Sequence, residues 1–158
     1  MRTEAPEPVV TGRARVMFLC TGNSCRSQMA EGFARHLLGE RLDACSAGTA
    51  PQGLNRLAVR AMAEAGVDIA GHASKRIEAC DPATIDLVIT VCGHADENCP
   101  AFLRRNARTR VVHRGFDDPP RLAAHAASDD EAMPFYRRVR DEIRAFVLEL
   151  PRLLEAGR

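Results

Sequence analysis

A cysteine, an arginine and a serine stand close together in residues 20–27, which read CTGNSCRS. In a C-x5-R-S segment the chain curls so that successive backbone N–H groups point inward, and such a concave nest binds anions. Gly22 and Asn23 tolerate the positive φ that this curl needs. The segment therefore predicts a binding loop for a tetrahedral oxyanion such as phosphate or arsenate, formed by Thr21, Gly22, Asn23, Ser24, Cys25 and Arg26.

Cys20 begins this loop and is the candidate nucleophile. A helix expected after the loop presents free N–H groups and a positive dipole end to the same point, and the Arg26 guanidinium binds two oxygens at once. The same groups favour a thiolate, so they predict a lowered pKa for Cys20. Ser27 offers a further hydrogen bond. C-x5-R alone arises by chance in proteins where the cysteine is a small core residue, but the strand-loop-helix setting favours the catalytic interpretation.

The elements that position the loop alternate between strands and helices. The apolar run 16–20 predicts a strand buried on both faces, and residues 27–38 carry apolar side chains at helical spacing. Further strands are predicted over 42–46, 86–92 and 110–113, and further helices over 55–65 and 130–154. This order predicts one α/β domain, with a four-stranded parallel sheet flanked by helices on both faces and the ligand at the carboxyl ends of the strands.

Composition narrows the class of protein. A chain of 158 residues with 46% hydrophobic residues suits one domain, and a net charge of +1 gives no electrostatic footprint for nucleic acid or an anionic membrane. We expect a disordered leader over residues 1–13 and a domain over 14–158. The N-terminus lacks the apolar run of a signal peptide and no stretch has transmembrane length, so a cytoplasmic protein with reduced cysteines is expected. Cys45 and Cys80 then read as small buried apolar residues.

Four further segments extend the loop's pattern: SAG at 46–48, CGHADENCP at 92–100, GFDDP at 115–119 and FYRRVRDEI at 135–143. Together with CTGNSCRSQMAEG they resemble the thioredoxin-coupled arsenate reductases, which share the low molecular weight tyrosine phosphatase fold. The resemblance covers roughly residues 15–150. It implies arsenic detoxification by reduction of arsenate to arsenite, with no bound cofactor and with thioredoxin as electron donor and partner. Phosphate or sulfate would compete for the loop.

The resemblance also implies a role for each reacting residue. Asp118, held by the following Pro119, would protonate the departing oxygen as the general acid, in preference to Asp117. Cys92 would attack Cys20 and release arsenite, and Cys99 would then attack Cys92 to pass the disulfide outward to thioredoxin.

The seven residues from Cys92 to Cys99 constrain how that disulfide forms. In a helix their Cα atoms would lie about 10 Å apart, whereas a disulfide needs about 4.4–6.8 Å. The segment is therefore expected to loop or melt on oxidation.

Some members of the resembled family bind potassium beneath the loop through positions that match Asn23, Glu31 and Ser46. Two other positions of that site hold Ala73 and Lys75 here, in place of Thr and Asp. We expect the Lys75 ammonium to replace the cation, pairing with Glu31 and bonding Asn23 and Ser46. His72 matches a position near Cys92 and could tune that thiol.

Two other functions stay open. A low molecular weight tyrosine phosphatase would share the loop and the acid, but Gln28 and the sequence DPPRL lack the proline and the aromatic side chains that it would need. A non-catalytic oxyanion sensor would have lost the nucleophile or the acid, and both are present. Zinc is not expected, because Cys-x-His-x4-Cys lacks an obvious fourth ligand. A monomer is the default expectation.

Overall fold

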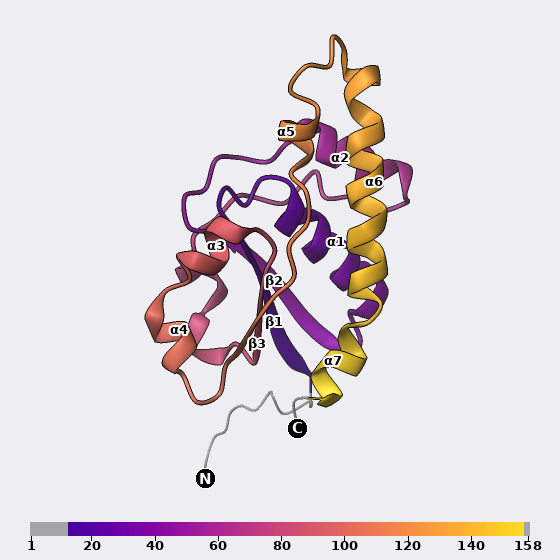
Figure 1. Cartoon of the computed structure of the whole chain (residues 1–158). Helices are drawn as coiled ribbons and strands as arrows, with labels where there is room; N and C mark the ends of the chain where they lie inside the picture. The colour runs from indigo at the N-terminus through magenta and orange to yellow at the C-terminus, as the bar shows by residue number, and fades with distance from the viewer. Residues whose placement is uncertain (1–12, 157–158) are drawn as a thin grey trace.

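The computed structural model describes residues 13–156. Four parallel strands form one sheet in the order β2-β1-β3-β4 (Figure 1), namely β1 (Ala14–Cys20), β2 (Leu42–Gly48), β3 (Leu87–Thr90) and β4 (Arg110–His113). The predicted four-stranded parallel sheet is confirmed. Of the predicted leader, only Arg13 lies within the described residues, and its guanidinium donates to the Leu42 carbonyl.

The helices are α1 (Arg26–Leu38), α2 (Arg56–Glu64), α3 (Gly93–Glu97), α4 (Ala101–Arg105), α5 (Pro119–Leu122), α6 (Asp129–Val147) and α7 (Leu150–Ala156), with 3-10 turns η2 (Ile77–Cys80) and η3 (Pro82–Thr84). The helical stretch predicted over 130–154, with Pro151 expected to kink its end or mark the end of its main segment, is divided into α6 and α7. Pro151 has no N–H to donate, and its ring would clash with the Val147 carbonyl of a continuous helix.

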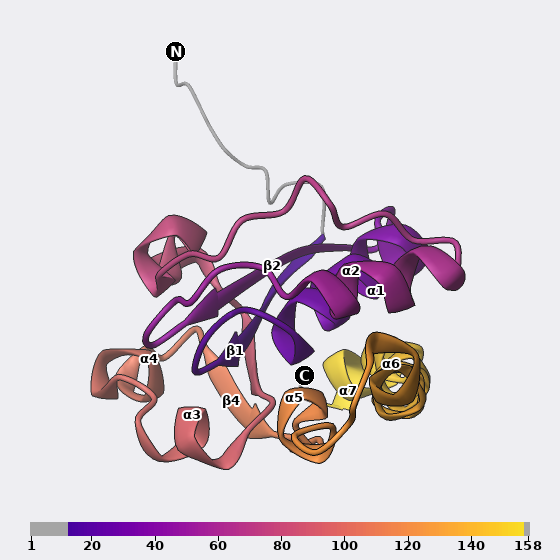
Figure 2. The ribbon, with the colours of Figure 1, turned by 90° about the horizontal axis from the view of Figure 1, so that it is seen from above.

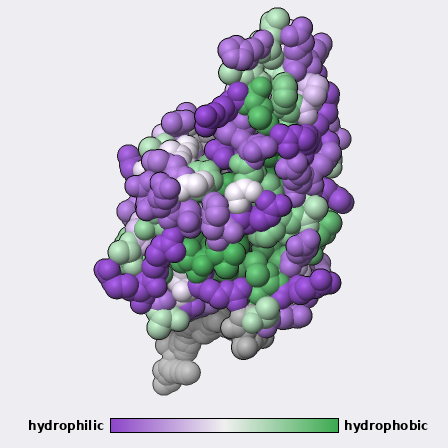
Figure 3. Space-filling model, in the orientation of Figure 1, coloured by the Kyte–Doolittle hydropathy of each residue, from purple (hydrophilic) through white to green (hydrophobic). Residues whose placement is uncertain are grey.

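The sheet lies between two groups of helices. Figure 2 shows α1, α2 and α6 on one side and α3 and α4 on the other. The centre of β1 is fully buried, with no solvent exposure from Val16 to Leu19. Figure 3 shows a mostly hydrophilic face with hydrophobic side chains gathered in its lower middle, between α4 and α7. Partly buried residues of β4 and α7 pack against the core: Val111, Val112, Leu153 and Leu154.

The strand register brings the predicted reactive residues to one edge of the sheet. Cys20 pairs with Gly48 on β2, and Leu19 pairs with Thr90 on β3, two residues before Cys92. Gly48 is required here, because a Cβ at this position would lie 2.6 Å from the Thr21 carbonyl oxygen. The SAG segment therefore lets the oxyanion loop pack directly on the end of β2.

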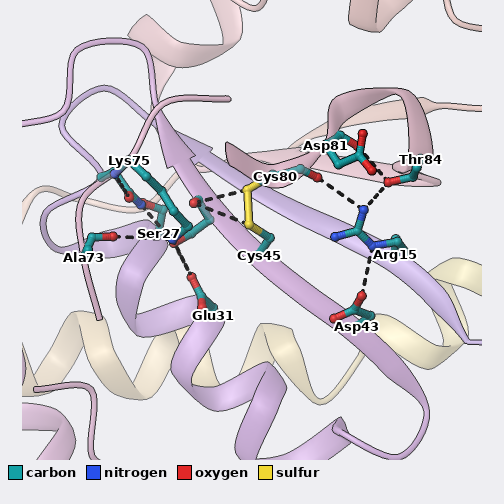
Figure 4. Close-up of a disulfide and its surroundings, with 12 residues drawn as sticks. Arg15, Ser27, Glu31, Asp43, Cys45, Ala73, Lys75, Cys80, Asp81 and Thr84 are labelled. Atoms are coloured by element: carbon teal, nitrogen blue, oxygen red, sulfur yellow. Dashed lines mark hydrogen bonds and ion pairs between the residues drawn. A yellow bond between two sulfur atoms is a disulfide. The ribbon is translucent and has the colours of Figure 1, made fainter. Parts of the chain in front are cut away.

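One disulfide joins β2 to η2 between Cys45 and Cys80, with a Cα–Cα distance of 6.0 Å (Figure 4). The expectation that these were separate reduced thiols is wrong. The cysteines are 35 residues apart in the chain, and they meet because the segment after α2 folds back along β2, where Arg76 bridges to Gly48. Cys20, Cys25, Cys92 and Cys99 are free and buried.

Candidate active site

The segment that follows β2 holds the oxyanion loop from outside. Backbone N–H groups of Thr49, Ala50, Gln52 and Asn55 donate to the carbonyls of Cys20, Thr21, Gly22 and Ser24 at 2.8–3.1 Å. Within residues 13–156, the N–H groups of residues 22–25 make no hydrogen bond to a protein acceptor. The loop therefore turns its carbonyls outward and keeps its donors for an anion.

Two loop residues carry the curl in different ways. Asn23 has φ 47°, as predicted. Gly22 does not have a positive φ, so that prediction is wrong. Its lack of a side chain instead leaves room for Gln52, whose Oε1 would lie 2.8 Å from an added Cβ.

Arg26, the first residue of α1, brings the loop and the candidate acid together. Its Nη1 donates to the Phe116 carbonyl at 2.9 Å, and its Nη2 lies 3.5 Å from Asp118 Oδ1. Arg26 Nε is buried and has no hydrogen-bond partner among the described residues. That donor suits an oxyanion, because a buried polar group without a partner is costly.

The two acids of the GFDDP segment point to different partners. Asp118 faces Arg26 with its side chain 37% exposed, whereas Asp117 pairs with Arg138 of α6 at 3.1 Å. This geometry agrees with the assignment of the acid to Asp118.

Cys20 and Cys92 share a hydrogen bond, which determines where the negative charge resides. The Cys20 thiol donates to Cys92 Sγ, and this bond, with burial, raises the pKa of Cys20. The pKa of Cys92 falls to about 4, because Cys92 accepts from Cys20, then from Thr21 and from the Ala95 N–H, and lies near Arg26. Arg26 and the Thr21 N–H of the loop lower the pKa of Cys20, as predicted, but the opposing effects of Cys92 and of burial are larger, so the net shift is upward.

The other two free cysteines are weaker acids than an ordinary thiol, because burial raises the pKa of each. Cys99 follows α3 and is buried, and burial raises its pKa. Burial also raises the pKa of Cys25, with Asp118 adding to the effect. Cys25 contributes its backbone instead, and its carbonyl accepts from the Met29 N–H at 2.9 Å.

A buried polar network supports the loop from below. Asn23 Nδ2 donates to both Ser27 Oγ and Ser46 Oγ at 2.9 Å, and Ser46 donates to Glu31 at 2.5 Å. Asn23, Ser27 and Ser46 are fully buried, and Glu31 is 4% exposed. The predicted loop-supporting residues thus form one connected network.

Lys75 joins this network mainly through Glu31. Its ammonium lies 3.3 Å from Glu31 Oε1 and 3.4 Å from the Ala73 carbonyl oxygen (Figure 4). The predicted bonds from the ammonium to Asn23 and Ser46 are wrong, because Asn23 Oδ1 accepts the backbone N–H of Lys75 instead, at 2.9 Å.

His72 also lies under the loop and not beside Cys92. Its Nδ1 is 3.0 Å from Gln28 Oε1 and 4.0 Å from Glu31 Oε2. Burial lowers its pKa, and Glu31 opposes that shift. The suggestion that His72 tunes Cys92 is therefore not matched by the contacts of its ring.

Sequence reasoning missed the residues that contact Cys92 from the side. Thr21 Oγ1 lies 3.4 Å from Cys92 Sγ and 2.9 Å from His94 Nδ1. The only available signal was that Thr21 follows Cys20 and His94 follows Cys92 by two residues. Among the described residues, no group of three or more His, Cys, Asp or Glu side chains is arranged to hold a metal ion.

Comparison with known proteins defines the class. The family described as low molecular weight phosphotyrosine protein phosphatase matches residues 15–156. An arsenate reductase of Halalkalibacterium halodurans is 48% identical over 128 residues, covering 81% of this chain and 88% of that protein. An arsenate reductase of Bacillus subtilis is 46% identical over the same coverage.

Solved structures agree with the sequence relatives. An arsenate reductase in the phosphate-binding state superimposes with a TM-score of 0.71 and 31% identity, covering 87% of this chain and 95% of that one. A low molecular weight protein tyrosine phosphatase from T. tengcongensis gives a TM-score of 0.68 at 25% identity, covering 88% and 98%. The chain belongs to the low molecular weight phosphotyrosine protein phosphatase family, and within it to the group of the arsenate reductases.

Proposed function

We propose that the protein reduces arsenate to arsenite with a relay of Cys20, Cys92 and Cys99, and that thioredoxin supplies the electrons. The proposal rests on one observation above all, the placement of Cys92 at the oxyanion loop, where its thiol interacts with Cys20 and its Sγ lies 3.4 Å from Thr21 Oγ1. A phosphatase needs no second thiol at its nucleophile, whereas a reductase does. The arsenate reductases among its relatives support the same activity.

In the first step Cys20 attacks arsenic. Arsenate binds the free N–H groups of the loop and the Arg26 guanidinium, and the proton of the Cys20 thiol passes to Cys92. The Cys20 thiolate forms an S–As bond, and one oxygen leaves as water after receiving a proton from Asp118. Arsenic is still arsenic(V) at this point.

The electrons move in the second step. Cys92 first releases to solvent the proton that it took from Cys20. The Cys92 thiolate then attacks Cys20 Sγ, the S–As bond breaks, and its electron pair remains on arsenic, which leaves as arsenite. Cys99 then attacks Cys92, which frees the Cys20 thiolate and leaves a Cys92–Cys99 disulfide. The dithiol of thioredoxin reduces this disulfide, so two electrons and two protons convert one arsenate to arsenite and water.

The decisive assay is arsenate-dependent NADPH consumption with thioredoxin and thioredoxin reductase. We expect turnover in the wild type and its loss in Cys92→Ser and in Cys99→Ser. The Cys45→Ser/Cys80→Ser double variant is the matched control, because it removes two cysteines outside the relay and should keep turning over. Absence of turnover in the wild type, together with rapid hydrolysis of an aryl phosphate, would instead assign a phosphatase.

We also propose that Lys75 takes the place of a potassium ion beneath the loop. The Lys75 side chain is 25% exposed, and its ammonium lies against the buried carboxylate of Glu31. A cation at this place balances the negative charge of that carboxylate. We expect equal turnover in potassium and sodium buffers of the same ionic strength. Strong activation by potassium would contradict this assignment.

We propose that the enzyme is a monomer. Gel filtration at the assay concentration tests this, and a dimer that loses activity on dilution would contradict it.

No helix in the described part of the chain is long and apolar enough to cross a membrane. We propose a cytoplasmic location, where thioredoxin is available, and tagging and fractionation of cells would check it.

A further inference from the structure

The His94 side chain connects α3 to the oxyanion loop and has no part in the proposed relay. It lies on α3 two residues after Cys92, and its Nδ1 is 2.9 Å from Thr21 Oγ1. Thr21 Oγ1 is in turn 3.4 Å from Cys92 Sγ. The three groups form a chain of contacts that ends on the sulfur proposed to attack the arsenic-bearing cysteine.

The direction of the hydrogen bonds in this chain follows from a single hydrogen atom. The Thr21 hydroxyl has one hydrogen, which it can give either to His94 or to Cys92. If His94 Nδ1 were unprotonated, it would compete as an acceptor for that hydrogen. If Nδ1 carries the proton, it donates to Thr21 Oγ1, and the hydroxyl hydrogen is free to point at Cys92.

We propose that His94 is a positioning residue for the reductase reaction. The hydrogen of its ring is on Nδ1 and is donated to Thr21 Oγ1, and this directs the Thr21 hydroxyl onto Cys92 Sγ. The inference rests on the proposed function, because only a reductase uses Cys92 as an attacking thiolate. His94 does not touch the substrate or the reacting sulfurs, so its action passes through Thr21.

The surroundings of Cys92 leave this donor a distinct role. Cys92 Sγ also accepts from the Ala95 N–H at 3.3 Å and from the Cys20 thiol. The Cys20 donor disappears when Cys20 is bonded to arsenic. At that moment Thr21 and the Ala95 amide are the donors left to hold Cys92 as a thiolate and aim it at Cys20.

The tautomer is the first test, and it does not depend on arsenate. Nitrogen-15 NMR of the wild-type protein labelled at histidine should show a proton on Nδ1 of His94. A ring that is protonated only at Nε2 would overturn the proposal, because the Thr21 hydrogen would then go to His94.

The second test measures the thiol itself. The rate at which iodoacetamide alkylates Cys92, followed by peptide mass spectrometry over a range of pH, reports its thiolate. His94→Ala should move the Cys92 profile to higher pH, and His94→Asn should restore it, because the Asn amide can donate to Thr21. Thr21→Val should reproduce the effect of His94→Ala, and Thr21→Ser should not.

Glu97→Ala is the matched control, since Glu97 is an exposed residue of the same helix. If Glu97→Ala shifts the Cys92 profile as much as His94→Ala does, the effect belongs to helix stability and the proposal fails. Turnover of His94→Ala in the thioredoxin-coupled assay should fall roughly two- to tenfold, as expected for the loss of one typical hydrogen bond. If the wild type shows no turnover but the profile shifts as described, the proposed function fails while the link from His94 to Cys92 stands.

Discussion

Cys20 and Cys92 divide one proton between two sulfurs, and this arrangement changes how the nucleophile is activated. A loop that attracts anions was expected to ionise Cys20 directly. In the structure the interaction with Cys92, together with burial, raises the pKa of Cys20, and the same interaction lowers the pKa of Cys92. In the proposed relay Cys92 would act twice, first as the acceptor of the Cys20 proton and then, after releasing that proton, as the thiolate that attacks Cys20.

Removing the Cys20 donor tests this division of charge. In Cys20→Ala the pKa of Cys92 should rise from about 4 toward the ordinary value of a thiol, because the interaction with Cys20 that lowers it most is lost. The thiolate absorbance near 240 nm would then appear at higher pH than in the wild type, where it persists until the pH falls through about 4. Cys99→Ala should leave that low-pH step in place. An unchanged low-pH step in Cys20→Ala would mean that Thr21, Ala95 and Arg26 are enough to keep the pKa of Cys92 low without Cys20.

The neighbouring acids of the GFDDP segment allow a matched pair of variants. Asp118→Asn should slow the single-turnover release of arsenite by roughly 10²–10⁴-fold, the usual contribution of a general acid. Asp117→Asn should change it little, since Asp117 pairs with Arg138 on α6. If both variants slow arsenite release equally, the cause would be a general electrostatic effect of the GFDDP segment and not proton transfer from Asp118.

At the scale of elements, the strand-loop-helix unit could be predicted because its signals are local. The β1 run, the oxyanion loop and the start of α1 are consecutive in sequence, and the predicted strand at 110–113 matches β4. The Cys45–Cys80 disulfide could not be predicted, because it depends on how residues 66–86, which lack regular periodicity, return along β2. The predicted contacts of Lys75 are confirmed only for Glu31, which pairs with the ammonium. Asn23 accepts from the backbone N–H of Lys75 instead of from the ammonium.

The disulfide should stabilise the fold under oxidising conditions. It closes a loop between positions 35 apart, for which chain entropy predicts roughly 3–4 kcal/mol. Urea unfolding of Cys80→Ala without reductant should show a loss of that order relative to the wild type. With reductant present the difference should shrink to the packing effect of one buried sulfur. A full-sized difference under both conditions would assign the loss to packing.

The segment between Cys92 and Cys99 should change shape on oxidation. Residues 93–97 are helical in the structure, with Cys92 as the residue that caps α3. A Cys92–Cys99 disulfide needs its Cα atoms closer than a helix permits, so this turn has to open. Limited proteolysis should cut residues 93–100 faster in the oxidised protein than in the reduced one. Equal digestion of the two forms would contradict the expected opening.

For the whole molecule, the fold class and the edge that carries the site followed from sequence alone. Alternating strands and helices leave few topologies, and ligands of parallel sheets bind at the carboxyl ends of the strands. The opposite pKa shifts of Cys20 and Cys92 could not be predicted from the sequence, because they require an interaction between two side chains that are 72 positions apart.

Oxyanion binding should stabilise the entire domain, since only the folded chain assembles the loop. Phosphate at about 100 times its Kd should add about 2.7 kcal/mol, which corresponds to a rise in Tm of roughly 5–10 °C. Differential scanning fluorimetry in chloride and in phosphate at equal ionic strength measures this. Arg26→Ala should lose most of the rise, and a similar rise in that variant would point to an unspecific salt effect.

The disulfide between β2 and η2 also limits how the chain can go wrong. Six cysteines can form three disulfides in fifteen ways. In most of these pairings Cys20 would be bonded to a cysteine other than Cys92, its partner in the proposed relay. Once Cys45 and Cys80 are joined, four cysteines remain and only three complete pairings are possible. In the proposed relay, which makes and breaks disulfides, the Cys45–Cys80 bond therefore leaves each of the other four cysteines only three possible partners.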